Sequence, residues 1–379
     1  MAHQTTASVV WTSSETSVVR LVNGRSFTRL RKRTQVQLSA SRLFRAGLPL
    51  IVALPLLLAC SDDPTGPKDP DPPIGHEAIV FVRDAQLHLV MPDGSGSRRF
   101  SAIQPVHAYD WSRATGLFAL NLWDPINPPP GPLRGIVILN SDGVRQRAIN
   151  GLEDSDRMHA ARWSPDGLEL AYTVNRPTAD GGGTWVARYD DTQARRVSEI
   201  TGSNMSWSPD GAQILYRNGC DLWLADPSGV SDPVPFDTGL RDCAYEPIWS
   251  PTNRIGVAVG DIYEFNRDGS EREVIRSACV DPPECNVSDS YNGVLYSPTG
   301  AKMALLVNTS MGILDLVDGT LVTIEGPAIY GYSWSEDGSR LAFGRNGNLE
   351  VVNSDGSGLH TVETGVIGYP TWIRLRAGQ

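Results

Sequence analysis

The sequence lacks the short motifs that usually identify an enzyme. It has no Gly-x-Ser-x-Gly elbow, no His-Glu-x-x-His pair and no glycine loop of the kind that holds phosphates. Histidine, the commonest acid–base residue in active sites, makes up only 6 of the 379 residues. These absences favour a role other than catalysis, but they leave open an active site assembled from scattered residues.

Positive charge is also scarce over most of the chain. The formal net charge is −10, yet residues 1–59 contain eight basic side chains and a single acid, Glu15. Removing their net charge of +7 from the total leaves −17 for residues 60–379. A body this acidic repels phosphate backbones, so we expect no binding to nucleic acid.

Long apolar runs are rare, and the clearest is residues 46–59, which read AGLPLIVALPLLLA. These fourteen residues are too few for a typical membrane helix, which needs about 20, but they suit the apolar part of a signal peptide. Basic residues precede the run, as export requires. The run ends in Leu57-Leu58-Ala59-Cys60, which resembles the lipobox of bacterial lipoproteins.

This resemblance implies cleavage before Cys60 and a lipid on its thiol and new amino terminus. An uncleaved anchor or a chance cysteine is the alternative. Residues 1–59 are thus expected to be a lipoprotein signal peptide, and residues 60–77, rich in proline and aspartate, an extended tether. In well-studied lipoproteins an Asp after the lipidated Cys favours the inner membrane, so Ser61 favours the outer membrane. We expect a lipid-anchored protein of the cell envelope that faces the periplasm or the surface.

From residue 78 onward one unit recurs: an aromatic residue, a serine, often Pro-Asp-Gly, and then an alternating apolar strand. Pro presets the first dihedral angle of such a turn, Asp bonds back to the backbone, and Gly accepts a positive φ. The spacings of the aromatic residues average 43.5 residues, close to the roughly 40–45 of a four-stranded propeller blade. These residues, called anchors below, are interpreted as packing between sheets; they are Trp111, Trp163, Trp207, Trp249, Tyr296, Trp334 and Trp372.

Seven anchors predict an all-β fold, a seven-bladed β-propeller over residues 78–379. Trp372 opens a unit that the remaining residues cannot complete, whereas residues 78–82 and 86–91 supply strands with no anchor strand before them. We expect the C-terminal strand to pair with these N-terminal strands. Such pairing closes the ring and leaves no long exposed edge.

The repeat resembles that of the TolB-like, WD40-like (PD40) family of β-propellers, which carries the same Trp-Ser-Pro-Asp-Gly core. The resemblance covers residues 78–379 and implies a propeller fold. It implies little about function, because propellers host binding proteins, lyases, hydrolases and scaffolds. TolB itself has six blades and a separate N-terminal domain, so its partners are not carried over.

Four cysteines remain when Cys60 is set aside, an even number in an exported protein in which disulfides persist. In a blade, the connections between second and third strands and those between blades lie on one face of the disc. All four cysteines fall in such connections. We predict the pairs Cys220–Cys243 and Cys279–Cys285, with a zinc site as the alternative, although no histidine lies close to them in sequence.

The same face, called the loop face below, carries every long connection, over residues 124–135, 151–160, 175–184 and 276–293. Long loops fixed by disulfides on a rigid ring often serve recognition, although functionless surface loops give the same pattern. The candidate binding residues on this face are Arg157, His159, Arg241, Tyr245 and Tyr291. The opposite face, called the turn face, is expected to have only tight turns.

Catalytic and metal chemistry find little support in these loops. His159 has no partner that the sequence identifies, and the acidic runs 153–156 and 281–284 show no ordered set of Ca²⁺ ligands. We expect no cofactor, with Ca²⁺ as the alternative. The sequence favours a lipid-anchored propeller that binds an envelope protein, or acts as a scaffold, through its loop face. The alternatives are a propeller enzyme, such as a lyase or glycan hydrolase, and a small-ligand binder with its site at the mouth of the central channel.

Overall fold

The computed structural model describes residues 8–10, 18–20, 75–106, 108–122, 135–150, 157–175, 181–190, 194–240, 243, 246–278, 291–365 and 368–375. The chain divides into two compact units, Met1–Gly66 and Pro67–Gln379, and each is described by itself. In the first unit, β1 (Ser8–Val10) pairs with β2 (Val18–Arg20) in antiparallel fashion. Both strands fall in the part of the sequence interpreted as a signal peptide.

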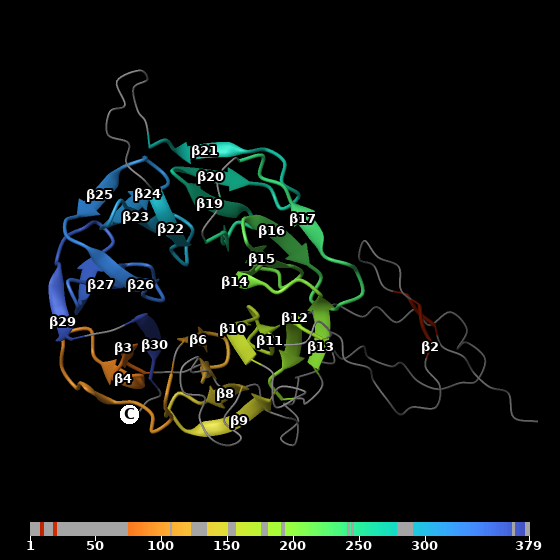
Figure 1. Ribbon diagram of the computed structural model, residues 1–379, viewed down its shortest axis with the longest axis horizontal. Coiled ribbons are helices and arrows are strands. Elements are labelled where there is room, and N and C mark those ends of the chain that lie inside the picture. The colour runs from red at the N-terminus through yellow and green to blue at the C-terminus, as the bar shows by residue number, and fades with distance from the viewer. Residues whose placement is uncertain are drawn as a thin grey trace, which may run out of the picture. The chain divides into compact units, whose positions relative to one another are not determined.

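The second unit is a seven-bladed β-propeller, as the repeat predicts (Figure 1). Each blade is a four-stranded antiparallel sheet whose first strand lies nearest the centre of the ring. Blades 1 to 4 consist of β30 (Thr371–Arg374), β3 (Glu77–Arg83), β4 (Gln86–Val90) and β5 (Arg98–Arg99); β6 (Ala108–Ser112), β7 (Leu117–Asn121), β8 (Gly135–Leu139) and β9 (Arg145–Asn150); β10 (Arg157–Trp163), β11 (Glu169–Asn175), β12 (Gly183–Arg188) and β13 (Ala194–Ser198); and β14 (Ser203–Trp207), β15 (Ile214–Asn218), β16 (Asp221–Ala225) and β17 (Val234–Phe236). Blades 5 to 7 consist of β18 (Ile248–Trp249), β19 (Ile255–Val259), β20 (Asp261–Phe265) and β21 (Glu273–Arg276); β22 (Tyr291–Tyr296), β23 (Lys302–Val307), β24 (Ser310–Asp315) and β25 (Leu321–Ile324); and β26 (Ala328–Trp334), β27 (Arg340–Arg345), β28 (Asn348–Asn353) and β29 (His360–Thr364).

The middle strands of the blades are buried on both faces. All five residues of β8 are buried, and so are residues 170–174 of β11. The strict alternation of buried and exposed residues that the sequence suggested for the strand after each anchor is therefore absent in β11. Each sheet packs between two neighbouring blades, so both of its faces meet apolar side chains instead of water.

The hydrophobic core is divided among the interfaces between blades. The described residues form seven buried clusters, one for each pair of neighbouring blades. In one of them, Ala171 and Val186 of blade 3 pack with Trp207 and Tyr216 of blade 4. Every cluster contains one anchor, and no anchor is more than 9% exposed. The anchors are thus packing residues, as expected.

The Ser-Pro-Asp-Gly turns close through side chains as well as backbone. In blade 3, Ser164 Oγ donates to Asp166 Oδ1 at 2.6 Å and accepts a hydrogen bond from Glu169 N at 2.9 Å. Asp166 also accepts from the backbone N–H two residues further on, and Gly167 adopts a φ of 69°. The same serine bonds recur in blades 4 and 7, at Ser208 and Ser335. The roles expected for Asp and Gly are confirmed, and the serine adds a tie to the start of the second strand.

The C-terminal strand closes the ring, as predicted. β30 pairs with β3, with Arg374 opposite Glu77 and Thr371 opposite Val80 (Figure 1). Tyr109 of the next blade supports this junction, because its hydroxyl lies 2.8 Å from the carbonyl oxygen of Val80 and 2.6 Å from that of Tyr369. Blade 1 is therefore assembled from the two ends of the propeller segment.

Candidate functional site

The two faces of the disc are built differently. On the turn face, side chains close the turns within a few residues. Besides the Ser-Pro-Asp-Gly turns, four aspartates each accept a hydrogen bond from the backbone N–H of the serine two residues on; they are Asp93, Asp226, Asp268 and Asp355. Such locally bonded turns are short and rigid.

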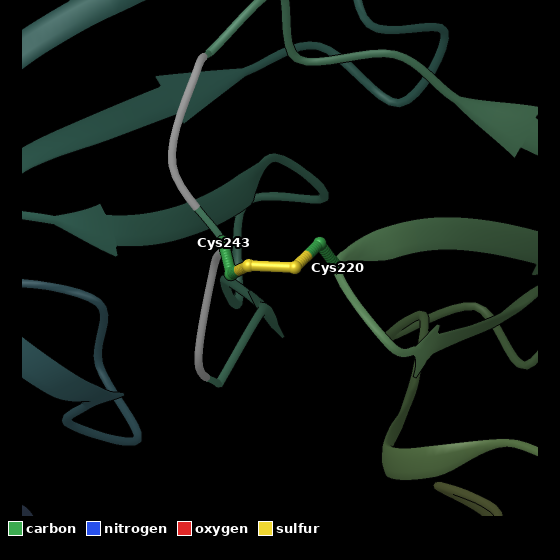
Figure 2. The surroundings of a disulfide bond; sticks show 2 residues. All are labelled: Cys220 and Cys243. Atoms are coloured by element: carbon green, nitrogen blue, oxygen red, sulfur yellow. A yellow bond between two sulfur atoms is a disulfide. The ribbon is translucent and has the colours of Figure 1, made fainter.

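The loop face carries a disulfide. Cys220, between β15 and β16, is bonded to Cys243, which lies in the connection from β17 to β18 (Figure 2). Their Cα atoms are 4.5 Å apart, and 23 positions separate the two residues in sequence. This is the pairing expected from the sequence. It ties the middle connection of blade 4 to the segment that leads into blade 5, so that segment has less conformational freedom.

The other predicted cysteine features lie outside the described residues. These are the pair Cys279–Cys285 and the lipidation residue Cys60. The two acidic runs considered for Ca²⁺, residues 153–156 and 281–284, also fall outside them.

His159 lies on β10 close to the loop face, where it is half-buried. Its Nε2 is 2.8 Å from Asn175 Nδ2, a partner on the neighbouring strand β11 that the sequence did not identify. Burial lowers the pKa of His159 below its usual range, so the ring is neutral at pH 7. It can accept or donate a hydrogen bond at this face but adds no charge. Arg157 begins the same strand at its loop-face end.

Tyr291 is buried, which corrects its assignment to the binding face. It is 1% exposed, it belongs to the core cluster between blades 5 and 6, and its hydroxyl accepts a hydrogen bond from Arg276 Nε at 3.0 Å. The physical reason is that β22 begins at this residue. Tyr291 is therefore part of an inner strand and not of the loop before it. Arg241 and Tyr245 lie outside the described residues.

The residue before each anchor lies on the innermost strand of its blade. In blade order these residues are Thr371, Asp110, Arg162, Ser206, Ile248, Leu295 and Ser333. All seven are partly exposed, whereas the anchors beside them are buried. They form a belt around the centre of the ring, polar from blade 7 through blade 4 and apolar in blades 5 and 6. We call it the central belt.

Polar members of the central belt link neighbouring blades. Asp110 Oδ2, Ser206 Oγ and Ser333 Oγ each accept a hydrogen bond from the backbone N–H of the next blade's anchor, at 2.7, 3.2 and 3.2 Å. Burial raises the pKa of Asp110, against the opposing effect of the charges on Arg162 and Arg113. A carboxyl group with a raised pKa beside two arginines is the most chemically distinctive group of the belt.

No three His, Cys, Asp or Glu side chains in the described ranges lie close enough together to hold a metal ion. In the same part of the chain, no helix has the length and apolar character needed to cross a membrane.

No protein-family model matches the chain, and no curated protein does. Solved structures do resemble it. A functionally unknown protein from Desulfotomaculum acetoxidans DSM 771 is 11% identical and has a TM-score of 0.56, with 79% of this chain and 99% of that chain covered. An oligogalacturonate lyase in complex with manganese is 13% identical with a TM-score of 0.51, over 76% of this chain and 86% of the lyase. TolB from Acinetobacter baumannii is 17% identical with a TM-score of 0.46, over 79% of this chain and 66% of TolB.

At these identities the likenesses show the fold alone. The protein belongs to the structural class of β-propellers, whose members differ widely in function. The narrower resemblance to the TolB-like repeat family continues to rest on the Trp-Ser-Pro-Asp-Gly motif in the sequence.

Proposed function

We propose that the protein is a lipid-anchored envelope protein whose propeller binds a protein partner through its loop face. The observation that carries this proposal is the contrast between the two faces. One consists of short turns closed by their own side chains, and the other holds the long connections and the Cys220–Cys243 disulfide. Long connections held on a rigid scaffold suit recognition.

The path of the chain also favours the loop face as the binding surface. The propeller segment enters at Glu77, which pairs with Arg374 at the turn-face end of β30. A lipid on Cys60 would therefore be connected to the propeller through the turn-face end of β3. Residues 60–77 are proline-rich and, at about 3 Å per residue in an extended conformation, reach about 50 Å. The loop face is the face of the disc opposite Glu77, and in this proposal the partner binds there.

Charge indicates the kind of partner. Asp221 follows Cys220 directly, and Asp237 lies in the connection that holds Cys243; both carboxylates are exposed. The whole segment from residue 60 onward is acidic. A partner with a basic contact surface would associate fastest with such a face.

The test is crosslinking and affinity capture of the full-length lipidated protein from native membranes, with mass spectrometry of what is captured. The loop-face variant is Asp221→Lys with Asp237→Lys. A matched variant on the turn face is Asp232→Lys with Asp318→Lys, because it makes the same change in charge. Like Asp237, Asp318 accepts one backbone hydrogen bond.

We expect wild type and the turn-face variant to capture the same protein, and the loop-face variant to capture at least about tenfold less of it, the effect of losing a few charged contacts. Equal capture by all three proteins would contradict the proposal, as would recovery of the protein alone. Recovery of the protein alone would instead favour a binding site at the centre of the ring.

A further inference from the structure

Charge is distributed unevenly along the propeller. Residues 78–150, which include blade 2 and most of blade 1, contain seven basic and five acidic side chains, a net charge of +2. Residues 151–379 contain 17 basic and 32 acidic side chains, a net charge of −15. Blades 1 and 2 are therefore a positive sector, whereas the rest of the chain is on balance strongly acidic.

The arginines of this sector lie mainly at the outer rim of the ring. The outermost strand of blade 1, β5, consists of Arg98 and Arg99, and that of blade 2, β9, contains Arg145 and Arg147 (Figure 1). We call these four residues the arginine rim; Arg147 is half-buried and the other three are exposed. By contrast, the outermost strands of blades 4, 6 and 7 contain no lysine or arginine.

The two halves of the arginine rim meet at the interface between blades 1 and 2. Arg98 lies opposite Leu89 and Arg145 opposite Leu139, and residues opposite each other point to the same side of a sheet. Both leucines belong to the buried cluster between blades 1 and 2, so both arginines face this interface. The backbones also touch here, because a Cβ on Gly143 would overlap the carbonyl oxygen of the residue that follows β5.

The arginine rim has few opposing carboxylates. None of its four members forms an ion pair with a carboxylate of the described residues. The pKa of Asp190 is lowered mainly by its hydrogen bond from Arg188 and less by the charge of Arg147. Asp142, in the turn before β9, accepts its side-chain hydrogen bond from Asn140 Nδ2 at 3.1 Å.

The balance stays positive when the turns before these strands are counted. Residues 91–100 of blade 1 contain one aspartate and two arginines, and so do residues 140–150 of blade 2, which gives each segment a net charge of +1. The matching segments of blades 4, 6 and 7 each have a net charge of −2; they are residues 226–236, 315–324 and 354–364.

The arrangement suits an extended anionic surface better than a single small anion. Arg147 lies opposite Ile138, which belongs to the cluster between blades 2 and 3, so Arg147 and Arg145 face different neighbouring blades. The charges therefore spread along the rim instead of converging on one point. Val144, directly before Arg145, is 56% exposed. Basic side chains beside an exposed apolar one are typical of surfaces that meet lipid headgroups.

We propose that the arginine rim docks on the anionic headgroups of a phospholipid membrane, with the ring edge-on and blades 1 and 2 toward the lipid. The acidic remainder of the propeller is repelled by the same surface, which favours this orientation over the others. Edge-on docking leaves the loop face uncovered.

This proposal rests on the proposed function in one respect, the lipid anchor. The chain enters the propeller at β3, in the blade that carries Arg98 and Arg99. A lipid on Cys60 would keep the propeller within the reach of its tether, so the local concentration of headgroups is high. A few charged contacts are then enough to select which side of the ring faces the lipid.

The test uses the full-length protein, purified from membranes, in vesicles of phosphatidylcholine alone or of an equal mixture with phosphatidylglycerol. Phenylglyoxal modifies accessible arginines, and mass spectrometry of peptides measures the rate at each one. The variant is Arg145→Glu. The matched control is Arg272→Glu, which makes the same charge reversal at an exposed arginine directly before β21, the outermost strand of blade 5.

In wild type, we expect phosphatidylglycerol to slow the modification of Arg98, Arg99 and Arg147 at least about threefold and to leave Arg272 unchanged. High salt should abolish this protection, because it screens charges on the surface. Arg145→Glu should weaken docking at least about fivefold, the effect of one basic residue near an anionic membrane, and so expose the other three arginines. Arg272→Glu should keep the protection.

Three results would each overturn the proposal: equal modification in the two kinds of vesicle, protection of Arg272 as strong as that of Arg98, or unchanged protection in the Arg145→Glu variant. A soluble hexaglutamate peptide is the competing probe. Protection by this peptide and none by phosphatidylglycerol would assign the arginine rim to an acidic protein and would overturn the proposal as well.

The intact mass of the purified protein separates this proposal from the proposed function. A protein without a lipid on Cys60 contradicts the anchor, while added vesicles of the two compositions still test the arginine rim. A lipidated protein without protection contradicts docking and leaves the anchor standing.

Discussion

Asp210 and Asp337 show how one carboxylate holds a turn of a blade. Each accepts a hydrogen bond from the hydroxyl of the serine two residues before it and from the backbone N–H two residues after it. The bond from Ser208 is the main cause that lowers the pKa of Asp210 to about 2. For Asp337 the backbone bond from Ser339 comes first, and the pKa is again about 2.

A lowered pKa predicts how Asp337 affects stability across pH. The ordinary pKa is 3.8, so the ionised carboxylate stabilises the folded state fully above that pH, and its contribution is lost as pH falls through about 2. The side chain is largely exposed, so solvent screening keeps the effect below about 1 kcal/mol. Wild type should melt about 2 °C above Asp337→Asn at pH 7, as followed by circular dichroism.

The difference should shrink below pH 4 and be small at pH 2, where about half of the Asp337 side chains are protonated in the folded state and nearly all are in the unfolded state. Each pair of melts at pH 2 serves as the control for the pair at pH 7. A difference that stays constant from pH 7 to pH 2 would show that the charge of Asp337 does not hold the turn.

Single residues also show which roles the sequence can predict and which it cannot. The roles of Asp166 and Gly167 follow from local turn geometry, which a few adjacent residues determine. The sequence predicts Tyr291 at the surface, whereas it is buried, because the residues around it do not show where β22 begins. The missed residues of the central belt, such as Asp110, share no residue type. Only their position relative to the anchor unites them.

At the level of elements, the turn that joins the first two strands is the most repeated part of the fold, yet its copies are not equivalent. Gly167 and Gly211 occupy the same turn position in blades 3 and 4, each with a φ of 69°. A Cβ on Gly167 would overlap Ser112 Oγ and come within 2.8 Å of Thr115 Cγ2 in the neighbouring blade. A Cβ on Gly211 would have its nearest neighbour at 3.9 Å, Pro165 Cδ.

These surroundings predict different costs for the same substitution. Gly211→Ala should reduce the free energy of unfolding by about 1–2 kcal/mol, the cost of a left-handed backbone for a residue with a Cβ. Gly167→Ala should cost about 1–3 kcal/mol more, because Ser112 and Thr115 are buried and must shift. Urea unfolding of the two variants beside wild type measures both values. Equal losses of unfolding free energy would mean that Ser112 and Thr115 can shift at little cost.

At the level of the whole molecule, closure of the ring could be predicted because it depends only on the number and positions of the anchors. Seven anchors, with the last one near the end of the chain, leave its strand without a partner except the strands at the start of the propeller. A pocket on the turn face, lined among others by Arg113, Glu336 and Arg374, could not be predicted in this way. Arg113, Glu336 and Arg374 come from three blades, and the seam that leaves the space between them exists only after the ring has closed.

Closure of the ring by β30 also predicts that the stability of the propeller depends on this last strand. β30 and the residue that follows it contribute three side chains that are almost completely buried, Trp372, Ile373 and Leu375. The loss of one buried tryptophan costs about 3–5 kcal/mol, and a typical domain has only about 5–15 kcal/mol in total. A chain that ends at Gly368 should therefore lose most of its cooperative thermal unfolding and become sensitive to protease.

Adding a peptide of residues 369–379 in excess should restore both properties, because the missing strand can pair with β3 from outside the chain. A peptide with Trp372→Ala and Ile373→Asp is the matched control and should restore neither, since it keeps the backbone donors and acceptors but loses the buried side chains. If the shortened chain melts like wild type without any peptide, closure by β30 contributes little to stability. If both peptides restore it equally, backbone pairing is sufficient, and the side chains of Trp372 and Ile373 in the two core clusters that flank blade 1 are not what holds the ring together.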